Sequence, residues 1–138
     1  MIKLNPYISF KDTTREAMEF YKSIFGGELT MSTFKEGMGQ DGPEADHIMH
    51  AMFVVGPEMT LMASDTPEHM EYKPAAGMSI SLSGESNDEE KLTAYWEKLI
   101  EGGNAFMPLS KAPWGDTFGM VTDKFGITWM VNIAGKKE

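Results

Sequence analysis

The stretch KDTTREAMEFYKSIFGGE, residues 11–28, decides the fold, because it carries the pattern of an amphipathic helix with a defined start and end. Apolar side chains recur at helical spacing along its middle. Thr13 and Glu16 have the spacing of a capping box, and Gly26-Gly27 is typical of a helix C-terminus. The sequence therefore predicts one helix here, and the segments around it decide how the helix is used.

Four flanking segments have the alternating or β-branched pattern of strands. One precedes the helix, KLNPYISF (3–10), and one follows it, ELTMSTFKE (28–36). Two more, HIMHAMFVVG (47–56) and EMTLMASD (58–65), are separated by a Gly-Pro turn. The predicted order in this half of the chain is a strand, a helix and three strands.

The same order recurs in the second half. A helix is predicted within ESNDEEKLTAYWEKLIEGG (85–103), where Ser86 and Glu89 have capping-box spacing and a glycine pair again ends the pattern. The strands of this half are predicted at 77–84, 104–112, 116–123 and 127–133. The halves align locally, with the glycine pairs 76 residues apart, MTLMAS over ITWMVN at 68, and YISF over SISL at 72. These offsets indicate a duplicated module with length changes in the loops.

Composition and length are those of one folded domain. The chain has 138 residues, of which 41% are hydrophobic and 24% are charged, as in ordinary globular proteins. A chain of this length suits a single domain. We therefore expect residues 1–138 to form one domain, with module one at about 1–66 and module two at about 77–134.

Charge and cysteine content exclude several classes of function. A formal net charge of −9 disfavours binding to nucleic acid and to anionic membrane surfaces. The absence of cysteine removes disulfides and thiolate nucleophiles. The start of the chain lacks a signal-peptide pattern, and the longest apolar run, 51–55, is far shorter than the ~20 residues of a membrane span. We therefore expect a cytoplasmic protein without a nucleic-acid or membrane partner.

The stretch GMGQDG, residues 37–42, matches the G-x-G-x-x-G pattern that cradles a dinucleotide pyrophosphate. That pattern works only where a strand leads through the glycines into the N-terminus of a helix. Here the glycines lie between two predicted strands, and no helical pattern follows them. The sequence therefore predicts a loop at this position.

The modules, together with several short motifs, resemble the vicinal oxygen chelate superfamily, which includes glyoxalase and bleomycin-resistance proteins, and within it the PhnB-like branch. The most specific motifs are His50-Ala51, Ser64-Asp65, Trp114-Gly115-Asp116 and Asp123-x-Phe125-Gly126-x-x-Trp129. The resemblance implies an α+β fold in which two tandem βαβββ modules form a cupped, incompletely closed mixed β-sheet with helices on the outer face. It does not select an activity, because the superfamily includes lyases, dioxygenases, fosfomycin-modifying enzymes and antibiotic-sequestering proteins.

Metal enzymes of the superfamily place their ligands on the first and last strands of each module. The resemblance carries those positions to Asn5, Met62, Ser79 and Met130. Two thioethers, a hydroxyl and a carboxamide are weak ligands for zinc, nickel or iron(II). We therefore predict that the protein holds no metal and no cofactor.

The histidines of the third predicted strand do not rebuild a metal site. His47 and His50 lie three residues apart, so a strand points them to opposite faces. Asp46 shares a face with His50, but roughly 13 Å of strand separates the two. Two interpretations of His50 stay open, a hydrogen-bonded structural histidine and a pocket group. Asp65 is expected to form a turn.

A ligand pocket is predicted between the concave faces of the two modules. Its lining residues are Asn5, Tyr7, His50, Met62, Ser79, Ser81, Trp114, Asp116 and Met130. Strand alternation places the tyrosine with the asparagine, and the two serines together, so each module gains a polar stripe. The two methionines supply an adaptable apolar floor, for which core packing is the alternative. The tryptophan is expected to cap the cavity mouth beside the aspartate acceptor, with an aromatic anchor and a turn as the alternative.

Three functions stay open, and the sequence does not decide whether a reaction is catalysed. The first is a metal-free module that binds a small amphipathic molecule. The second is a lyase, dioxygenase or transferase of the superfamily that uses His50, Asp116 or Tyr7 as acid or base, or an atypical metal. The third is the 3-demethylubiquinone methyltransferase label often attached to PhnB-like sequences, which ranks last because the usual glycine loop is missing. The resemblance and the exposed edges of open sheets imply a homodimer.

Overall fold

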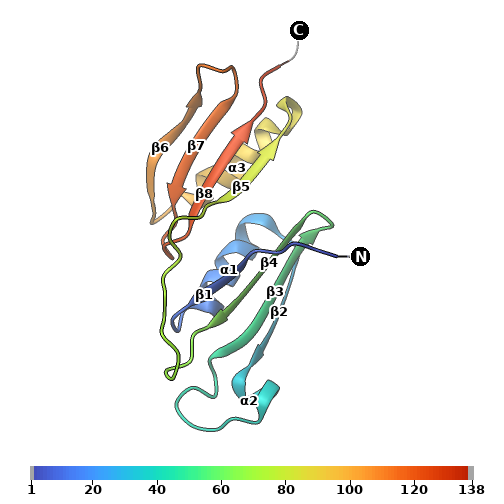
Figure 1. Cartoon of the computed structure of the whole chain (residues 1–138). Coiled ribbons are helices and arrows are strands. Elements are labelled where there is room, and N and C mark those ends of the chain that lie inside the picture. The colour runs from blue at the N-terminus through green and yellow to red at the C-terminus, as the bar shows by residue number, and fades with distance from the viewer. Residues whose placement is uncertain (1, 137–138) are drawn as a thin grey trace. The chain divides into compact units, whose positions relative to one another are not determined.

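The chain forms two units, which divide between Ala75 and Ala76, in the computed structural model (Figure 1). The structure describes residues 2–136. The elements of the first unit are β1 (Tyr7–Phe10), α1 (Thr14–Phe25), β2 (Glu28–Thr33), α2 (Phe34–Met38), β3 (Ile48–Gly56) and β4 (Met59–Asp65). The strands lie in the order β1-β4-β3-β2, in which β1 runs parallel to β4 and the other neighbours are antiparallel.

The second unit repeats this topology. Its elements are β5 (Ile80–Gly84), η1 (Ser86–Asp88), α3 (Glu89–Leu99), β6 (Asn104–Lys111), β7 (Thr117–Thr122) and β8 (Thr128–Ile133). The strands lie in the order β5-β8-β7-β6, and β5 runs parallel to β8. The predicted α+β class with two tandem βαβββ modules is therefore confirmed, and neither mixed sheet closes into a barrel. The single domain over residues 1–138 and the joint cupping of the two sheets remain predictions.

In the first unit, α1 covers one face of the sheet because its apolar side chains fall on one side of the helix. Ala17, Met18 and Tyr21 have no exposed surface, and α1 contacts β2, β3 and β4. The covered face of the sheet carries Phe10 and Phe53, each 2% exposed. Burial of each large apolar side chain contributes about 1.5–3 kcal/mol. This face therefore holds the unit together, and the opposite face is left open.

The second unit has the same two-layer arrangement. Leu92, Trp96 and Leu99 are the buried residues of α3, and this helix contacts β5 and β8. Val121 and Val131, from neighbouring strands, have no exposed surface. Because side chains alternate along a strand, the residues next to these valines in β7 and β8 point to the open face of the second sheet.

The strand pairing corrects one of the internal alignments. Tyr7 pairs with Met62 in the first unit, and Ser81 pairs with Met130 in the second. Met62 and Met130 are 68 residues apart, as predicted, but Tyr7 then corresponds to Ser81 rather than to Ser79. The correct offset for the first strands is two residues larger than predicted. Because the error is an even number, it leaves every side chain on its predicted face.

Both predicted capping boxes are wrong. The Thr13 side chain makes no capping hydrogen bond, and a carboxylate oxygen of Asp65 accepts the Thr14 N–H at 3.0 Å instead. In the second unit the box joins Glu85 to Asp88, one residue earlier than predicted, and it opens η1. The spacing alone was misleading because a side chain from β4, distant in the sequence, satisfies the start of α1.

The alternating pattern did not predict α2. The strand predicted at 28–36 ends at Thr33, which forms a capping box with Glu36 over hydrogen bonds of 2.9 and 3.1 Å. Gly39 ends the helix in the left-handed conformation, with a φ of 67°. The glycines of residues 37–42 therefore follow a helix rather than open one, which is the reverse of a nucleotide-binding turn. No helix within residues 2–136 has the length and apolar character to cross a membrane.

Candidate functional site

The open face of the first sheet carries two rows of side chains that run across its strands. The methionine row of the first unit consists of Tyr7, Met62, Met52 and Thr30, each paired with the next. The hydroxyl row, two residues further along the same strands, consists of Ser9, Ser64, His50 and Ser32. All eight side chains are half-buried or exposed within the chain. This face therefore combines a soft apolar strip with a polar strip.

A hydrogen bond joins the two rows. The Tyr7 hydroxyl lies 3.0 Å from Nδ1 of His50, and the two ring centroids are 5.7 Å apart. Tyr7 is 51% exposed, so the pair is open to solvent and to a ligand. When the tyrosine donates to Nδ1, the imidazole carries its proton on Nε2 and offers a donor there. His50 is thus hydrogen-bonded, as one interpretation has it, and its role as a pocket group remains a prediction.

The second sheet has a matching row on its own open face. The methionine row of the second unit consists of Ser81, Met130, Met120 and Met107, each paired with the next. Met62 and Met130 occupy equivalent positions in the two units, beside the first strand of each. The duplication therefore preserves a thioether strip on the open face of each sheet.

The structure groups the predicted pocket residues by unit. Tyr7, His50 and Met62 lie together on the first open face, and Ser81 and Met130 lie on the second. Asn5 and Ser79 precede β1 and β5 and lie outside both strands, with the serine exposed. The predicted pocket between the modules remains a prediction.

Asp116 forms hydrogen bonds with β8 and with the segment that follows it. Its carboxylate accepts the Gly135 N–H at 3.0 Å and a side-chain N–H of Asn132 at 3.1 Å. The bond from the Gly135 backbone, followed by that from Asn132, lowers the pKa of Asp116 below its ordinary value. A carboxylate with a lowered pKa is a poor proton acceptor at neutral pH, so these contacts favour the turn interpretation over an acid–base role.

Trp114 lies beside the open face of the second unit. It is 64% exposed, and its ring meets the Phe118 ring edge-on at a centroid distance of 5.9 Å. Phe118 pairs with Asn132 across β7 and β8, next to the methionine row of the second unit. The predicted role of Trp114 as a cap over a cavity mouth remains a prediction, and its exposure leaves the ring available for contact.

Two buried aspartates explain motifs that the sequence singled out. Asp65 is 4% exposed and accepts the N–H groups of Thr14 and Ile48, at 3.0 and 2.8 Å. Asp123 is 3% exposed and accepts the N–H groups of Phe125 and Ile127 and the indole N–H of Trp129. Asp65 ties the end of β4 to backbone that is distant in the sequence, whereas Asp123 holds the turn between β7 and β8 and the Trp129 side chain. These motifs therefore serve the fold.

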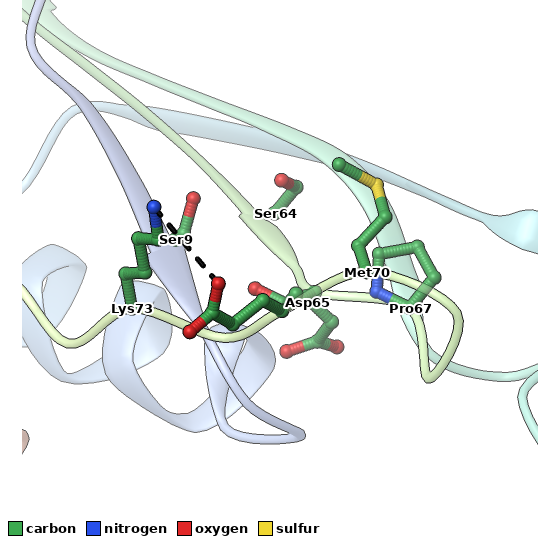
Figure 2. A pocket seen from close by; sticks show the side chains of 8 residues that line it. Ser9, Ser64, Asp65, Pro67, Met70 and Lys73 are labelled. Atoms are coloured by element: carbon green, nitrogen blue, oxygen red, sulfur yellow. Dashed lines mark ion pairs between the residues drawn. The ribbon is translucent and has the colours of Figure 1, made fainter.

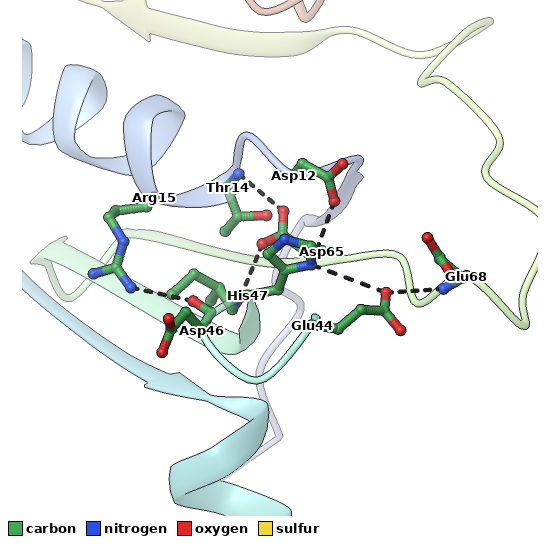
Figure 3. Close-up of polar contacts among 9 residues, drawn as sticks. Asp12, Thr14, Arg15, Glu44, Asp46, His47, Asp65 and Glu68 are labelled. Carbon is green, nitrogen blue, oxygen red and sulfur yellow. Dashed lines mark hydrogen bonds and ion pairs between the residues drawn. The ribbon is translucent and has the colours of Figure 1, made fainter. Parts of the chain in front are cut away.

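His47 belongs to a cluster on the other side of the first unit (Figure 3). Its Nδ1 lies 3.4 Å from Asp12 and 3.9 Å from Glu44. Glu44 also accepts the Glu68 N–H at 3.0 Å. His47 and His50 face different neighbours, but strand alternation is not the reason, because His47 lies just before β3 begins at Ile48.

The donor set does not fit the divalent metal of the superfamily. The carried-over positions supply the thioethers of Met62 and Met130, and Asn5 and Ser79 lie before the strands. Among residues 2–136, no three His, Asp or Glu side chains are grouped so that they could hold a metal ion. Thioether and hydroxyl groups are poor ligands for zinc, nickel or iron(II).

A cavity of about 250 Å³ lies in the first unit, where β1 and β4 end (Figure 2). Its lining residues are Ser9, Ser64, Asp65, Thr66, Pro67, Met70, Glu71 and Lys73. Ser9 and Ser64 come from the hydroxyl row, and the segment after β4 supplies the other walls. The sequence did not predict this site. Its one signal was the Ser64-Asp65 motif, and the loop after it has no regular pattern.

The fold is that of the vicinal oxygen chelate superfamily. The structure is similar to that of a glyoxylase/bleomycin resistance protein/dioxygenase domain from Frankia sp. EAN1pec, with a TM-score of 0.63 at 14% identity over 100% of this chain and 94% of the other. At that identity the likeness shows the fold alone.

The family model described as 3-demethylubiquinone-9 3-methyltransferase matches residues 2–132, and the chain belongs to this family of PhnB-like proteins. The structure is similar to that of protein PA1353 from Pseudomonas aeruginosa, with a TM-score of 0.88 and 37% identity over 99% of this chain and 100% of the other. It is also similar to that of the PhnB protein from Bacillus cereus, with a TM-score of 0.77 and 28% identity over 96% of this chain and 100% of the other.

Proposed function

We propose that the protein binds a small amphipathic molecule on the open faces of its sheets, without a classical metal centre. The observation that carries the proposal is the Tyr7–His50 hydrogen bond beside Met62 and Met52. Ligand sites combine a mostly apolar lining with a few polar groups that fix orientation. The open face of the first unit has this composition.

The methionines favour a binding role over simple packing. Met62 and Met52 are half-buried, whereas the opposite face of the same strands carries the buried core. Thioether side chains are flexible and polarisable, so they adapt to ligands of irregular shape. The equivalent Met130 and Met120 give the second open face the same property.

Native mass spectrometry of freshly purified protein tests the proposal. We expect a small molecule in stoichiometric amount and no divalent ion. Met62→Lys, which puts a charge into the methionine row, should lose the molecule. Met38→Lys should retain it, because Met38 is 68% exposed in α2 and belongs to neither row of the sheet face. Circular dichroism establishes that both variants are folded.

Two results would overturn this function. One is a bound molecule that the Met62→Lys and Met38→Lys variants retain equally, since its site then lies elsewhere. The other is one zinc, nickel, manganese or iron ion per chain that a chelator removes together with activity.

A second candidate function is acid–base catalysis, and the Tyr7–His50 pair favours it. A phenol bonded to an imidazole can relay a proton to a bound molecule. Asp116 is less suited to this role because its lowered pKa keeps it ionised. The test is to return a molecule released from the protein to ligand-free protein and follow its mass. A change of mass that Tyr7→Phe abolishes supports catalysis, and an unchanged mass supports binding alone.

The methyl transfer in the family description is the third candidate. Methyl donors such as S-adenosylmethionine need a cofactor pocket. Within residues 2–136, no glycine-rich turn leads from a strand into a helix N-terminus, and the glycines of 37–42 follow α2. Calorimetric titration with S-adenosylmethionine tests this candidate, and we expect no heat of binding.

We also propose a homodimer and a cytoplasmic location. In the first sheet β1 and β2 are edge strands, and in the second sheet β5 and β6 are. Edge strands leave backbone groups unpaired, and association between copies is one way to cover them. The negative net charge supports the expectation that the partners include neither nucleic acid nor membranes.

A further inference from the structure

Three thioether side chains lie next to one another on the open face of the second sheet. Met107 pairs with Met120 across β6 and β7, and Met120 pairs with Met130 across β7 and β8. Figure 1 shows these three strands side by side. Residues that pair directly on antiparallel strands project to the same face, with their Cβ atoms about 5 Å apart. The methionine row of the second unit therefore brings three sulfur atoms onto one face.

The three side chains can close on a single ion because methionine is long and flexible. Met120 is central, and each of its partners lies one strand away. A methionine side chain has three rotatable bonds, so the two outer thioethers can turn toward the central one. Met107 is 44% exposed, and Met120 and Met130 are half-buried. The row can therefore be reached from solvent and rearranged without disturbing the core under the other face.

The pairs on either side of this row carry no positive charge. On one side Phe118 pairs with Asn132. On the other side Thr122 pairs with Thr128, and their hydroxyl oxygens are 3.3 Å apart. The whole chain has a formal net charge of −9, so its field favours a cation over an anion. A cation at the row therefore meets no repelling group from the neighbouring pairs.

The donor set selects a class of cation. Thioether sulfur is a soft, uncharged ligand, and soft ligands select Cu(I) over hard or borderline divalent ions. The poor fit of Met62 and Met130 to zinc, nickel or iron(II) therefore has no bearing on this class. In the first unit the corresponding row has two methionines, Met62 and Met52, between Tyr7 and Thr30. Three thioethers in consecutive pairs are thus a property of the second unit.

We propose that Met107, Met120 and Met130 form a binding site for a soft monovalent cation, Cu(I). The three sulfur atoms are the ligands, and the ion links β6, β7 and β8 on the open face. The site lies within the second unit and does not depend on the proposed binding function. Because a thioether carries no proton, binding is independent of pH, whereas sites built on histidine or carboxylate weaken in acid. Cu(II) is not bound, because it prefers nitrogen and oxygen ligands.

Silver(I) is the probe, because it is a soft monovalent ion that does not change oxidation state in the assay. Full-length protein with carbon-13 in its methionine methyl groups is titrated with silver nitrate in chloride-free buffer. We expect the methyl resonances of Met107, Met120 and Met130 to move together and to saturate at one ion per chain. The methyl groups of Met38 and Met78, which are 68% and 80% exposed, are the control and should not move in this range. Equal shifts at Met38 and Met78 overturn the site, because single exposed thioethers then suffice.

Methionine-to-leucine variants remove one sulfur atom and keep the apolar character of the side chain. Met120→Leu deletes the central ligand and should weaken Cu(I) binding at least about tenfold, the lower limit for loss of even an outer-shell partner of a metal. Met38→Leu is the matched control and should leave the affinity unchanged. Competition with bathocuproine disulfonate measures the Cu(I) affinity in mildly acidic and in mildly alkaline buffer. An affinity that Met120→Leu does not lower, or that falls in acid, overturns the thioether site.

The outcomes separate this inference from the proposed function. Leucine is close to methionine in volume and polarity, so Met120→Leu should lose the ion and still hold a small molecule on the open face. The absence of silver-induced shifts in the row overturns the cation site and leaves the small-molecule function standing. A co-purified molecule that Met62→Lys retains counts against the small-molecule function, whereas one-to-one silver binding at Met107, Met120 and Met130 would still support the cation site.

Discussion

Replacement of Asp65 by alanine should cost the protein a large share of its stability. The carboxylate is 4% exposed and joins three elements, since it sits at the end of β4 and accepts N–H groups at the start of α1 and at the start of β3. In Asp65→Ala the amides of Thr14 and Ile48 lose these acceptors. The start of α1 has no side-chain cap to replace this carboxylate, because the Thr13 side chain makes no capping hydrogen bond.

The magnitude follows from the two bonds. An unsatisfied buried donor costs about 1–3 kcal/mol, so two donors cost about 2–6 kcal/mol. A domain is stable by about 5–15 kcal/mol, so this loss is severe. Asp65→Asn keeps one acceptor oxygen and places an amide N–H near the second donor, so its cost should fall between wild type and Asp65→Ala.

Urea unfolding followed by far-UV circular dichroism measures the free energy, and amide hydrogen exchange localises the effect to Thr14 and Ile48. All three tryptophans lie in the second unit, so tryptophan fluorescence is unsuited to this first-unit change. Asp41→Ala, at an exposed loop position, is the control and should stay within about 0.5 kcal/mol of wild type. The reasoning is refuted if Asp65→Ala matches Asp41→Ala and both amides keep their protection.

Three further predictions follow from single features. Because hydrogen bonds lower the pKa of Asp116, its carboxylate stabilises the fold above its ordinary pKa, and this stabilisation is lost as the pH falls through the lowered pKa. Asp116→Asn should therefore weaken the acid dependence of stability below about pH 4. An acid titration followed by circular dichroism that is the same in both proteins would contradict this. Gly27→Ala would bring a Cβ within 2.5 Å of the Val54 carbonyl oxygen, whereas Gly39→Ala meets only left-handed strain of about 1–2 kcal/mol, so thermal unfolding should show the larger loss for Gly27→Ala. Light scattering should give twice the 15.4 kDa chain mass at micromolar concentration, and a monomer mass throughout that range would refute the homodimer.

The order of elements could be predicted from sequence because the patterns that indicate helices and strands are local. Helical spacing followed by a glycine pair, and alternation in the strands, are written in neighbouring residues. The short helix α2 was missed because Phe34–Met38 is too short to show a helical period. The start of α1 was misassigned because its acceptor, Asp65, lies 51 residues from Thr14 in the sequence.

Of the candidate site, the sequence could predict only which side chains share a face of a strand. Alternation placed Tyr7 and Met62 on one face, and the register confirms that they pair. The bond between Tyr7 and His50 depends on the order β1-β4-β3, which brings together residues 43 apart in the sequence. The cavity beyond Ser64 depends on the path of an irregular segment, and no periodic pattern specifies such a path.

Because β1 pairs with β4, the first strand is synthesised well before the strand that it pairs with. Tyr7 leaves the ribosome first, yet its partner Met62 is translated 55 residues later. At 5–20 residues per second the first strand waits about 3–11 s, without its neighbour in the sheet. The second unit repeats the delay between Ser81 and Met130. We expect nascent chains stalled before β4 emerges to be cut readily by protease near Tyr7, and chains stalled after the whole first unit has emerged to resist.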